Sequence, residues 1–298
     1  MFKNMKLATK ISLGFGILIA IAGMLGYVGW MGLTNVTKNA EILAKSNQCL
    51  DQLNGCAQIR RDFAINGFAK DEKTGKTAAD KWFDTFDKLT TEISSLASTP
   101  GLSPANKDLA NNALNKSKPY KEAFDGQIEA QKLKDEAFAE WGKTGDAITT
   151  DFRETMKSLI APAIAKASES KDVNALTRWA KIDNMANESI LANFLQLRTQ
   201  AVYLASTNTK KQWLAYNEQL NVCQEESSKF TEYVKGDTTL EIFAAKIDKC
   251  IKGYETIGEK YYKGMLASET SDKDMAQSAT QIVELVNTLL SNIQKNVE

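Results

Sequence analysis

Arg60 is the residue whose surroundings in the sequence most clearly require a chemical partner. It lies in the centre of an apolar stripe with three- and four-residue steps, formed by Cys49, Leu53, Cys56, Ala57, Phe63, Ala64 and Gly67. A buried guanidinium without an anion is strongly unfavourable, so Arg60 needs a carboxylate. Its planar fork of N–H groups fits one. Two interpretations stay open: a ligand carboxylate, or an ion pair with Asp or Glu of a neighbouring helix.

Four further residues are candidates for the same chemistry. Arg61 follows Arg60 and points to the edge of the stripe. Arg198 lies at the flank of a second stripe, formed by Ile190, Phe194, Leu197, Ala201 and Leu204, and this position favours a solvated or paired arginine over a ligand contact. Tyr120 and Tyr254 have hydroxyls to offer to either pocket, although packing in a helical core is the commoner explanation for tyrosines at such positions.

The four cysteines fit no metal site. Their spacing matches no zinc motif, and the chain has no histidine. Cys49 and Cys56 are two helical turns apart, too far to bridge. Cys223 and Cys250 stand at similar distances on either side of the turn at Gly236. A disulfide between them is plausible in an oxidising compartment, and two small buried reduced residues are the alternative.

Composition excludes several classes of function. The 298 residues carry 37 Lys and Arg against 37 Asp and Glu. A nucleic-acid binder would show a basic excess, so we expect no nucleic-acid partner. No histidine is present, and no nucleophile has an activating partner at a recognisable spacing. We therefore expect no enzyme, no catalytic residue, no metal and no cofactor.

Residues 11–33 are predicted to form a transmembrane helix. The segment has no charged residue and is long enough to span the hydrocarbon core, about 30 Å thick. The lysines at positions 3, 6 and 10 predict that residues 1–10 are cytoplasmic. A cleaved signal peptide usually has a shorter apolar region, so an uncleaved anchor is the better interpretation. Residues after about 34 are then expected in the periplasm or outside the cell, and the chain itself in the inner (cytoplasmic) membrane.

The rest of the chain is predicted to be all-α. Turn and capping signals, such as Pro100–Pro104 and Asp172, divide it into segments with helical periodicity. The expected helices are residues 34–68, 77–97, 103–169, 172–205, 210–234 and 237–298. The order short, short, long occurs twice, which indicates an internal repeat.

Short connections make neighbouring helices antiparallel, and this predicts two stacked four-helix bundles that share the two long helices. A membrane-proximal bundle takes residues of about 34–135 and 269–298, and a distal bundle takes about 136–268. The last helix still shows an apolar stripe near residue 298. We therefore expect the chain to be the front part of a longer receptor.

At this point the chain resembles the extracytoplasmic part of bacterial methyl-accepting chemotaxis receptors. The segment 5–11, with Gly14–Gly16 after it, resembles the entry to their first membrane helix. Residues 34–298, with Arg60–Phe63 followed by Gly67, resemble their helical bimodular (HBM) sensor domain. The resemblance implies a homodimer that binds small carboxylates, such as citric-acid-cycle intermediates or acetate. Dicarboxylate-binding members have a second arginine one turn later, where this chain has Phe63.

Two functions follow as hypotheses. The first is the sensor part of a transmembrane chemoreceptor, which binds a small organic acid between its helices and passes the signal on by helix displacement. The alternative is a membrane-anchored helical scaffold or assembly protein without a small-molecule ligand. A sensor must contain an anion-binding pocket inside a bundle, whereas a scaffold should have a dry core.

Overall fold

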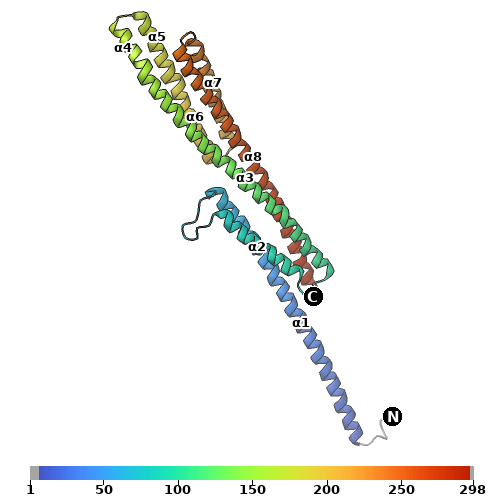
Figure 1. Ribbon diagram of the computed structural model, residues 1–298. Helices are drawn as coiled ribbons and strands as arrows, with labels where there is room; N and C mark the ends of the chain where they lie inside the picture. Colours follow the sequence, from blue (N-terminus) through green and yellow to red (C-terminus); the bar gives the residue numbers. More distant parts are fainter. Residues whose placement is uncertain (1–6, 296–298) are drawn as a thin grey trace. The chain divides into compact units, whose positions relative to one another are not determined.

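Nearly every described residue of the chain is helical, as the sequence predicts (Figure 1). The computed structural model describes residues 7–295 and contains no strand within them; Lys70 and Thr77 form an isolated bridge. The first six residues of the expected cytoplasmic segment 1–10 lie outside the described residues, as do residues 296–298 at the end of the last predicted helix.

The expected helices are present with boundaries that differ by a few residues. The first half of the chain forms α1 (Leu7–Asn66), α2 (Ala78–Ala97) and α3 (Pro104–Thr155), and α3 continues through the π-helical segment η2 (Met156–Ile160) into α4 (Ala161–Glu169). The second half forms α5 (Val173–Asn184), the π-helical segment η3 (Met185–Leu191), α6 (Ala192–Thr207), α7 (Lys210–Tyr233) and α8 (Thr238–Lys295). The predicted anchor and the first predicted helix are one continuous helix.

Capping residues explain why the helices begin where they do. Thr77 and Asp80 form a capping box at the start of α2, and the Asp172 carboxylate accepts a hydrogen bond from the Ala175 backbone N–H at 3.0 Å. At the start of α8 the Asp237 carboxylate accepts from the Leu240 backbone N–H at 3.3 Å, and the Glu241 carboxylate accepts from the Gly236 backbone N–H at 2.8 Å.

The two π-helical segments were not predicted. Each accommodates one residue more than a regular α-helix would need. The buried positions along α5, η3 and α6 show this extra residue: Ile182, Ala186, Ile190 and Phe194 follow at steps of four, before Leu197, Ala201 and Leu204 return to steps of three and four. The predicted stripe from Ile190 to Leu204 is buried, which confirms it.

The chain divides into two compact units. The first unit comprises the described residues of Met1–Phe124 and Lys273–Glu298, and the second unit comprises Asp125–Asp272. The long helices α3 and α8 contribute to both units, so two bundles share two helices as expected. End-to-end stacking of the bundles stays a prediction, as do their proposed membrane-proximal and distal positions.

The second unit has a core drawn from all of its helices. Ile160 of η2, Phe194 of α6, Phe230 of α7 and Leu240 of α8 are completely or almost completely buried in it. The α4–α5 and α7–α8 turns lie at one end of this unit (Figure 1), where Arg178 of α5 forms an ion pair with Asp237 at 3.1 Å. The α6–α7 turn connects two helices that pack side by side. This arrangement positions the groups described next.

Candidate functional site

The structure brings Arg60 and Tyr120 together in the first unit. Burial raises the pKa of Tyr120 well above its usual range, and the positive charge of Arg60 opposes that rise, so the two groups are neighbours. Arg60 is partly exposed, although the sequence predicted a buried guanidinium. A long arginine can keep its apolar stem in the stripe while its charged end extends past the edge, so partial exposure is compatible with a central position in the stripe. Arg61 is exposed.

An aromatic stack packs beside Tyr120. The Trp82 ring is stacked on Phe124 with 3.9 Å between the ring centroids and on Phe86 with 5.0 Å. Trp82 is completely buried, and among the described residues no hydrogen bond of normal geometry reaches its Nε1 atom. The polar part of this cluster therefore includes Arg60, the Tyr120 hydroxyl and one buried indole N–H.

Arg198 and Tyr254 meet in the second unit over the backbone of Gly145. A Cβ atom on Gly145 would lie 2.4 Å from the Tyr254 hydroxyl and 2.8 Å from Nε of Arg198. Only a glycine on α3 leaves room for both groups. Arg198 donates hydrogen bonds to Asp146 at 2.9 Å and to Thr149 at 3.3 Å. The Arg198 side chain is 31% exposed, whereas that of Asp146 is 78% exposed.

Hydrogen bonds fix the Tyr254 ring inside the second unit. Its hydroxyl donates to the Trp141 carbonyl at 3.0 Å, and its own carbonyl accepts from the Tyr216 hydroxyl at 2.6 Å. The Tyr216 hydroxyl in turn accepts from Trp141 Nε1 at 3.1 Å. Burial raises the pKa of Tyr254, opposed by the charge of Arg198, and the tyrosine therefore stays protonated. The Arg198 guanidinium thus has a rigid neighbour.

A surface groove of about 600 Å³ runs beside this cluster, between α3 and α8. It is lined by residues next to Gly145 and Tyr254, among them Thr144 and Gly253, and by the lysines at positions 143, 246 and 249. Lys246 forms an ion pair with Asp151 at 3.5 Å. The groove therefore offers several cations beside Arg198 and suits an anionic molecule.

Cys223 and Cys250 are both free in the structure. Burial raises the pKa of each thiol to about 12, and the charge of Arg198 opposes the rise at Cys250. Both thiols are thus protonated at neutral pH and poor nucleophiles. A disulfide between them stays a prediction. Among the described residues, no three Cys, Asp or Glu side chains gather as metal ligands would.

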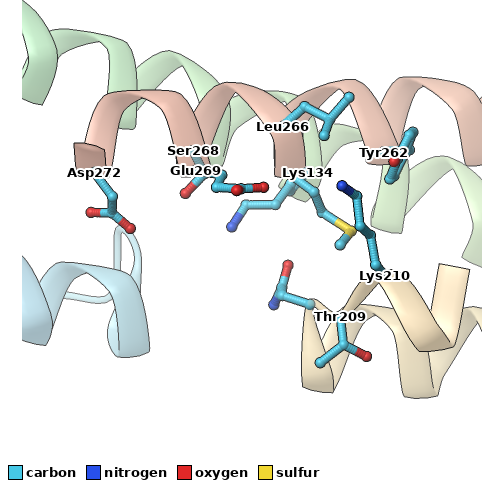
Figure 2. Close-up of a pocket in the computed structure, with 10 residues that line it drawn as sticks. Lys134, Thr209, Lys210, Tyr262, Leu266, Ser268, Glu269 and Asp272 are labelled. Atoms are coloured by element: carbon cyan, nitrogen blue, oxygen red, sulfur yellow. The ribbon is translucent and has the colours of Figure 1, made fainter. Parts of the chain in front are cut away.

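A second hollow, of about 480 Å³, lies between α3, α8 and the α6–α7 turn (Figure 2). Its lining includes Lys134 of α3, a buried lysine that sequence analysis did not select. The sequence contains a pattern that could have identified Lys134. It lies in the row of buried residues along α3 that recur at three- and four-residue steps, namely Gln127, Ala130, Lys134, Ala137 and Trp141. A charged residue within such a seam is the same pattern that singled out Arg60.

Comparisons with known proteins add little to this geometry. No family model matches the chain, and no curated protein does either. A chain from the "Crystal Structure of the TorS sensor domain - TorT complex in the presence of TMAO" is similar to this chain with a TM-score of 0.46 and 13% identity. The similarity covers 87% of this chain and 99% of that one.

Proposed function

We propose that the chain is the ligand-binding sensor part of a membrane-anchored bacterial receptor and binds a small organic acid at Arg198. The observation that carries this proposal is the unequal burial of the Arg198–Asp146 pair. The Arg198 side chain is 31% exposed and donates to Thr149 over the backbone of Gly145, while the side chain of its carboxylate partner is 78% exposed. Exposed ion pairs contribute about 0–1 kcal/mol, so a ligand carboxylate can displace Asp146 at little cost.

A membrane anchor is supported by the apolar surface of α1. Among the described residues, this is the one helix long and apolar enough to span a membrane, and no part of its apolar window is buried. Side chains such as Phe15, Met24 and Trp30 are 64–72% exposed. A bare apolar cylinder of this kind is stable in lipid and not in water. We infer that residues 11–33 span the inner membrane and that the two units lie in the periplasm or outside the cell.

The resemblance to chemoreceptors of the helical bimodular type gives the sensor its expected setting. In this proposal two copies of the chain pair through α1. Binding of the acid in the second unit displaces α8 relative to α3. The displacement then passes along α8 toward the membrane. Arg60 with Tyr120 is a second candidate site of the same kind in the first unit.

The test is a thermal-shift screen of the full chain in detergent against acetate, succinate, L-malate and citrate. Binding to the folded state alone raises the melting temperature. We expect at least one acid to do so, and Arg198→Gln to abolish the shift, which corresponds to a loss of about 2–5 kcal/mol of binding free energy. Asp146→Asn removes the internal competitor, so we expect it to strengthen binding.

Three outcomes would count against the proposal. If Arg60→Ala abolishes the shift and Arg198→Gln does not, the ligand binds in the first unit. If Asp146→Asn weakens binding as strongly as Arg198→Gln, the ion pair is structural and not exchangeable. If no acid raises the melting temperature, the alternative of a membrane-anchored scaffold is favoured.

A further inference from the structure

Lys134 is a charged residue in a position that the rest of its seam fills with uncharged side chains. It is 9% exposed. Among the described residues the structure shows neither a hydrogen bond nor an ion pair that involves its ammonium group, although the charges of Asp135 and Asp272 act on it from a distance. Figure 2 shows the Lys134 amine pointing into the hollow, between α8 and Thr209. A buried ammonium without a direct partner is costly, and its amine faces space that a ligand can occupy.

The hollow follows from the architecture of the second unit. Of the four helices packed together here, α6 ends and α7 begins at the α6–α7 turn, while α3 and α8 continue past it. The inward-facing residues of α3 beyond this turn are therefore no longer covered by α6 and α7. Gly264 keeps α8 close to α3 here, because a Cβ atom at that position would lie 2.9 Å from Cγ of Lys134 and 3.0 Å from the Ala130 carbonyl oxygen.

The lining of the hollow carries charges of both signs. Lys134 and Lys210 are its cations, and Glu269 and Asp272 are its carboxylates. The Asp272 carboxylate is oriented by Gln127, whose amide donates to it at 2.8 Å, and the Gln127 carbonyl accepts from the Ser268 hydroxyl at 2.6 Å. A simple anion would meet two like charges in this space, whereas a molecule with an ammonium and a carboxylate complements all four groups.

We propose that this hollow is a further binding site of the sensor, and that it takes a small zwitterion with an apolar body, such as an aliphatic amino acid. The ligand carboxylate would pair with Lys134 and Lys210, and its ammonium with Asp272 and Glu269. Met265 and Leu266 provide an apolar wall for the ligand side chain. The volume of about 480 Å³ is within the usual range for small-molecule sites. The site stands independently of Arg198.

The electrostatics of Lys134 agree with a site that is completed by a ligand. Burial lowers the pKa of its ammonium from the ordinary 10.5, and the charges of Asp135 and Asp272 only partly offset this effect. A folded-state pKa below the unfolded value means that the lysine destabilises the unliganded fold at neutral pH. A bound carboxylate removes this cost, so ligand binding and stability are coupled.

The experiment uses three probes with the same carbon skeleton. L-Leucine carries both charged groups, 4-methylpentanoate lacks the ammonium, and 3-methylbutylamine lacks the carboxylate. Each is added to the full chain in detergent, with binding followed by calorimetry and by the melting temperature. We expect L-leucine to bind at least about tenfold more tightly than either analogue, because only L-leucine presents a carboxylate to the two lysines and an ammonium to the two carboxylates.

The variants separate a binding lysine from a structural one. Lys134→Met should abolish the shift caused by L-leucine while leaving the melting temperature of the free chain equal or higher, because a buried charge is removed without loss of volume. Lys116→Met, which changes an exposed lysine on the same helix outside both the hollow and the groove, should change neither quantity. Asp272→Asn tests the acidic side by a second route and should weaken L-leucine binding.

Several results would overturn the inference. It fails if L-leucine, L-methionine and L-valine all leave the melting temperature unchanged, or if 4-methylpentanoate binds as tightly as L-leucine. It also fails if Lys134→Met keeps the shift, or if it lowers the melting temperature of the free chain, as expected for a structural ion pair. Arg198→Gln should leave the L-leucine shift intact, so that failure of this site and failure of the organic-acid site are distinguishable.

Discussion

The two units differ in how they pack a buried tyrosine that lies beside an arginine. Each places an arginine beside a buried tyrosine, Arg60 with Tyr120 in the first and Arg198 with Tyr254 in the second. In the first unit the aromatic residues around the tyrosine are stacked, and the central indole N–H has no hydrogen bond of normal geometry among the described residues. In the second unit they form a hydrogen-bonded network.

This difference bears on where ligands can bind. A network of hydrogen bonds holds side chains in fixed positions even where packing is incomplete, and the second unit is where the groove beside Arg198 and the hollow at Lys134 lie. The stacked aromatic cluster of the first unit is instead stabilised by close van der Waals contact, so a cavity beside it would cost more stability. In the second unit the hydrogen-bonded network thus holds the arginine and the tyrosine in place beside open space.

Tyr216→Phe should have the largest effect among the changes that test this comparison. The Tyr216 hydroxyl donates to the Tyr254 carbonyl and accepts from Trp141 Nε1, and both partners are buried. Removing the hydroxyl leaves the indole N–H unsatisfied. We expect a loss of about 2–4 kcal/mol in the free energy of unfolding, measured by urea denaturation in detergent.

Trp82→Phe is the matched change in the first unit. It removes ring volume from a stack but breaks no hydrogen bond of normal geometry, so its cost should be smaller, about 1–2 kcal/mol. A loss equal to or larger than that of Tyr216→Phe would mean that stacking stabilises the first unit as strongly as the network stabilises the second.

Gly145→Ala should disturb the second unit at the place where its arginine and tyrosine meet. The added methyl group would lie 2.4 Å from the Tyr254 hydroxyl and 2.8 Å from Arg198 Nε, so both must move. Overpacking of this kind costs about 1–3 kcal/mol. We also expect weaker binding of organic acids. Thermal denaturation and calorimetry on the same variant measure the two effects.

Gly142→Ala provides the control on the same helix. A Cβ atom at Gly142 meets nothing within 4 Å, so the change should stabilise α3 by about 0.5–1 kcal/mol through helix propensity alone. If Gly145→Ala is equally stabilising, the close approach of Tyr254 and Arg198 over this glycine does not hold in solution.

The last expected effect concerns alkaline pH. Burial raises the pKa of Cys223 from 9.0 to about 12. Because the thiol ionises earlier in the unfolded chain than in the folded one, its contribution to stability is complete below pH 9 and is lost as the pH rises toward 12. The loss should reach about 1 kcal/mol at pH 10. Comparing wild type with Cys223→Ala at pH 7 and pH 10 isolates this loss; parallel curves would show that the second unit's interior is wetter than its burial indicates.

Local signals explain why the helices could be predicted so well. Residues such as Ser103 with Pro104, and Asp172, determine helix starts through their own hydrogen bonds or fixed dihedral angles, without help from distant parts of the chain. The apolar stripes on α6 and α8 were equally easy to recognise in the sequence, because long helices in a bundle must bury one face. The residues from Met275 to Ile293 show this on α8.

The candidate site was less accessible to sequence reasoning. Arg60 and Lys134 share a seam position, yet Arg60 extends partly to water while Lys134 is nearly buried. The outcome depends on where neighbouring helices end, which is a tertiary property. Similarly, Gly145 and the Asp146 partner of Arg198 have no distinctive local pattern. Their importance depends on contacts with α6 and α8, far away in the sequence.

The π-helical segment η3 has a consequence for how this chain tolerates changes in length. Because η3 holds one surplus residue, deleting a single residue within Met185–Leu191 would restore a regular helix and keep the faces of α5 and α6 unchanged. The same deletion between Ala192 and Leu197 would rotate the residues after it by about 100° and turn Arg198 away from Gly145. Related sequences one residue shorter are therefore expected to have their gap in η3 and to keep the arginine.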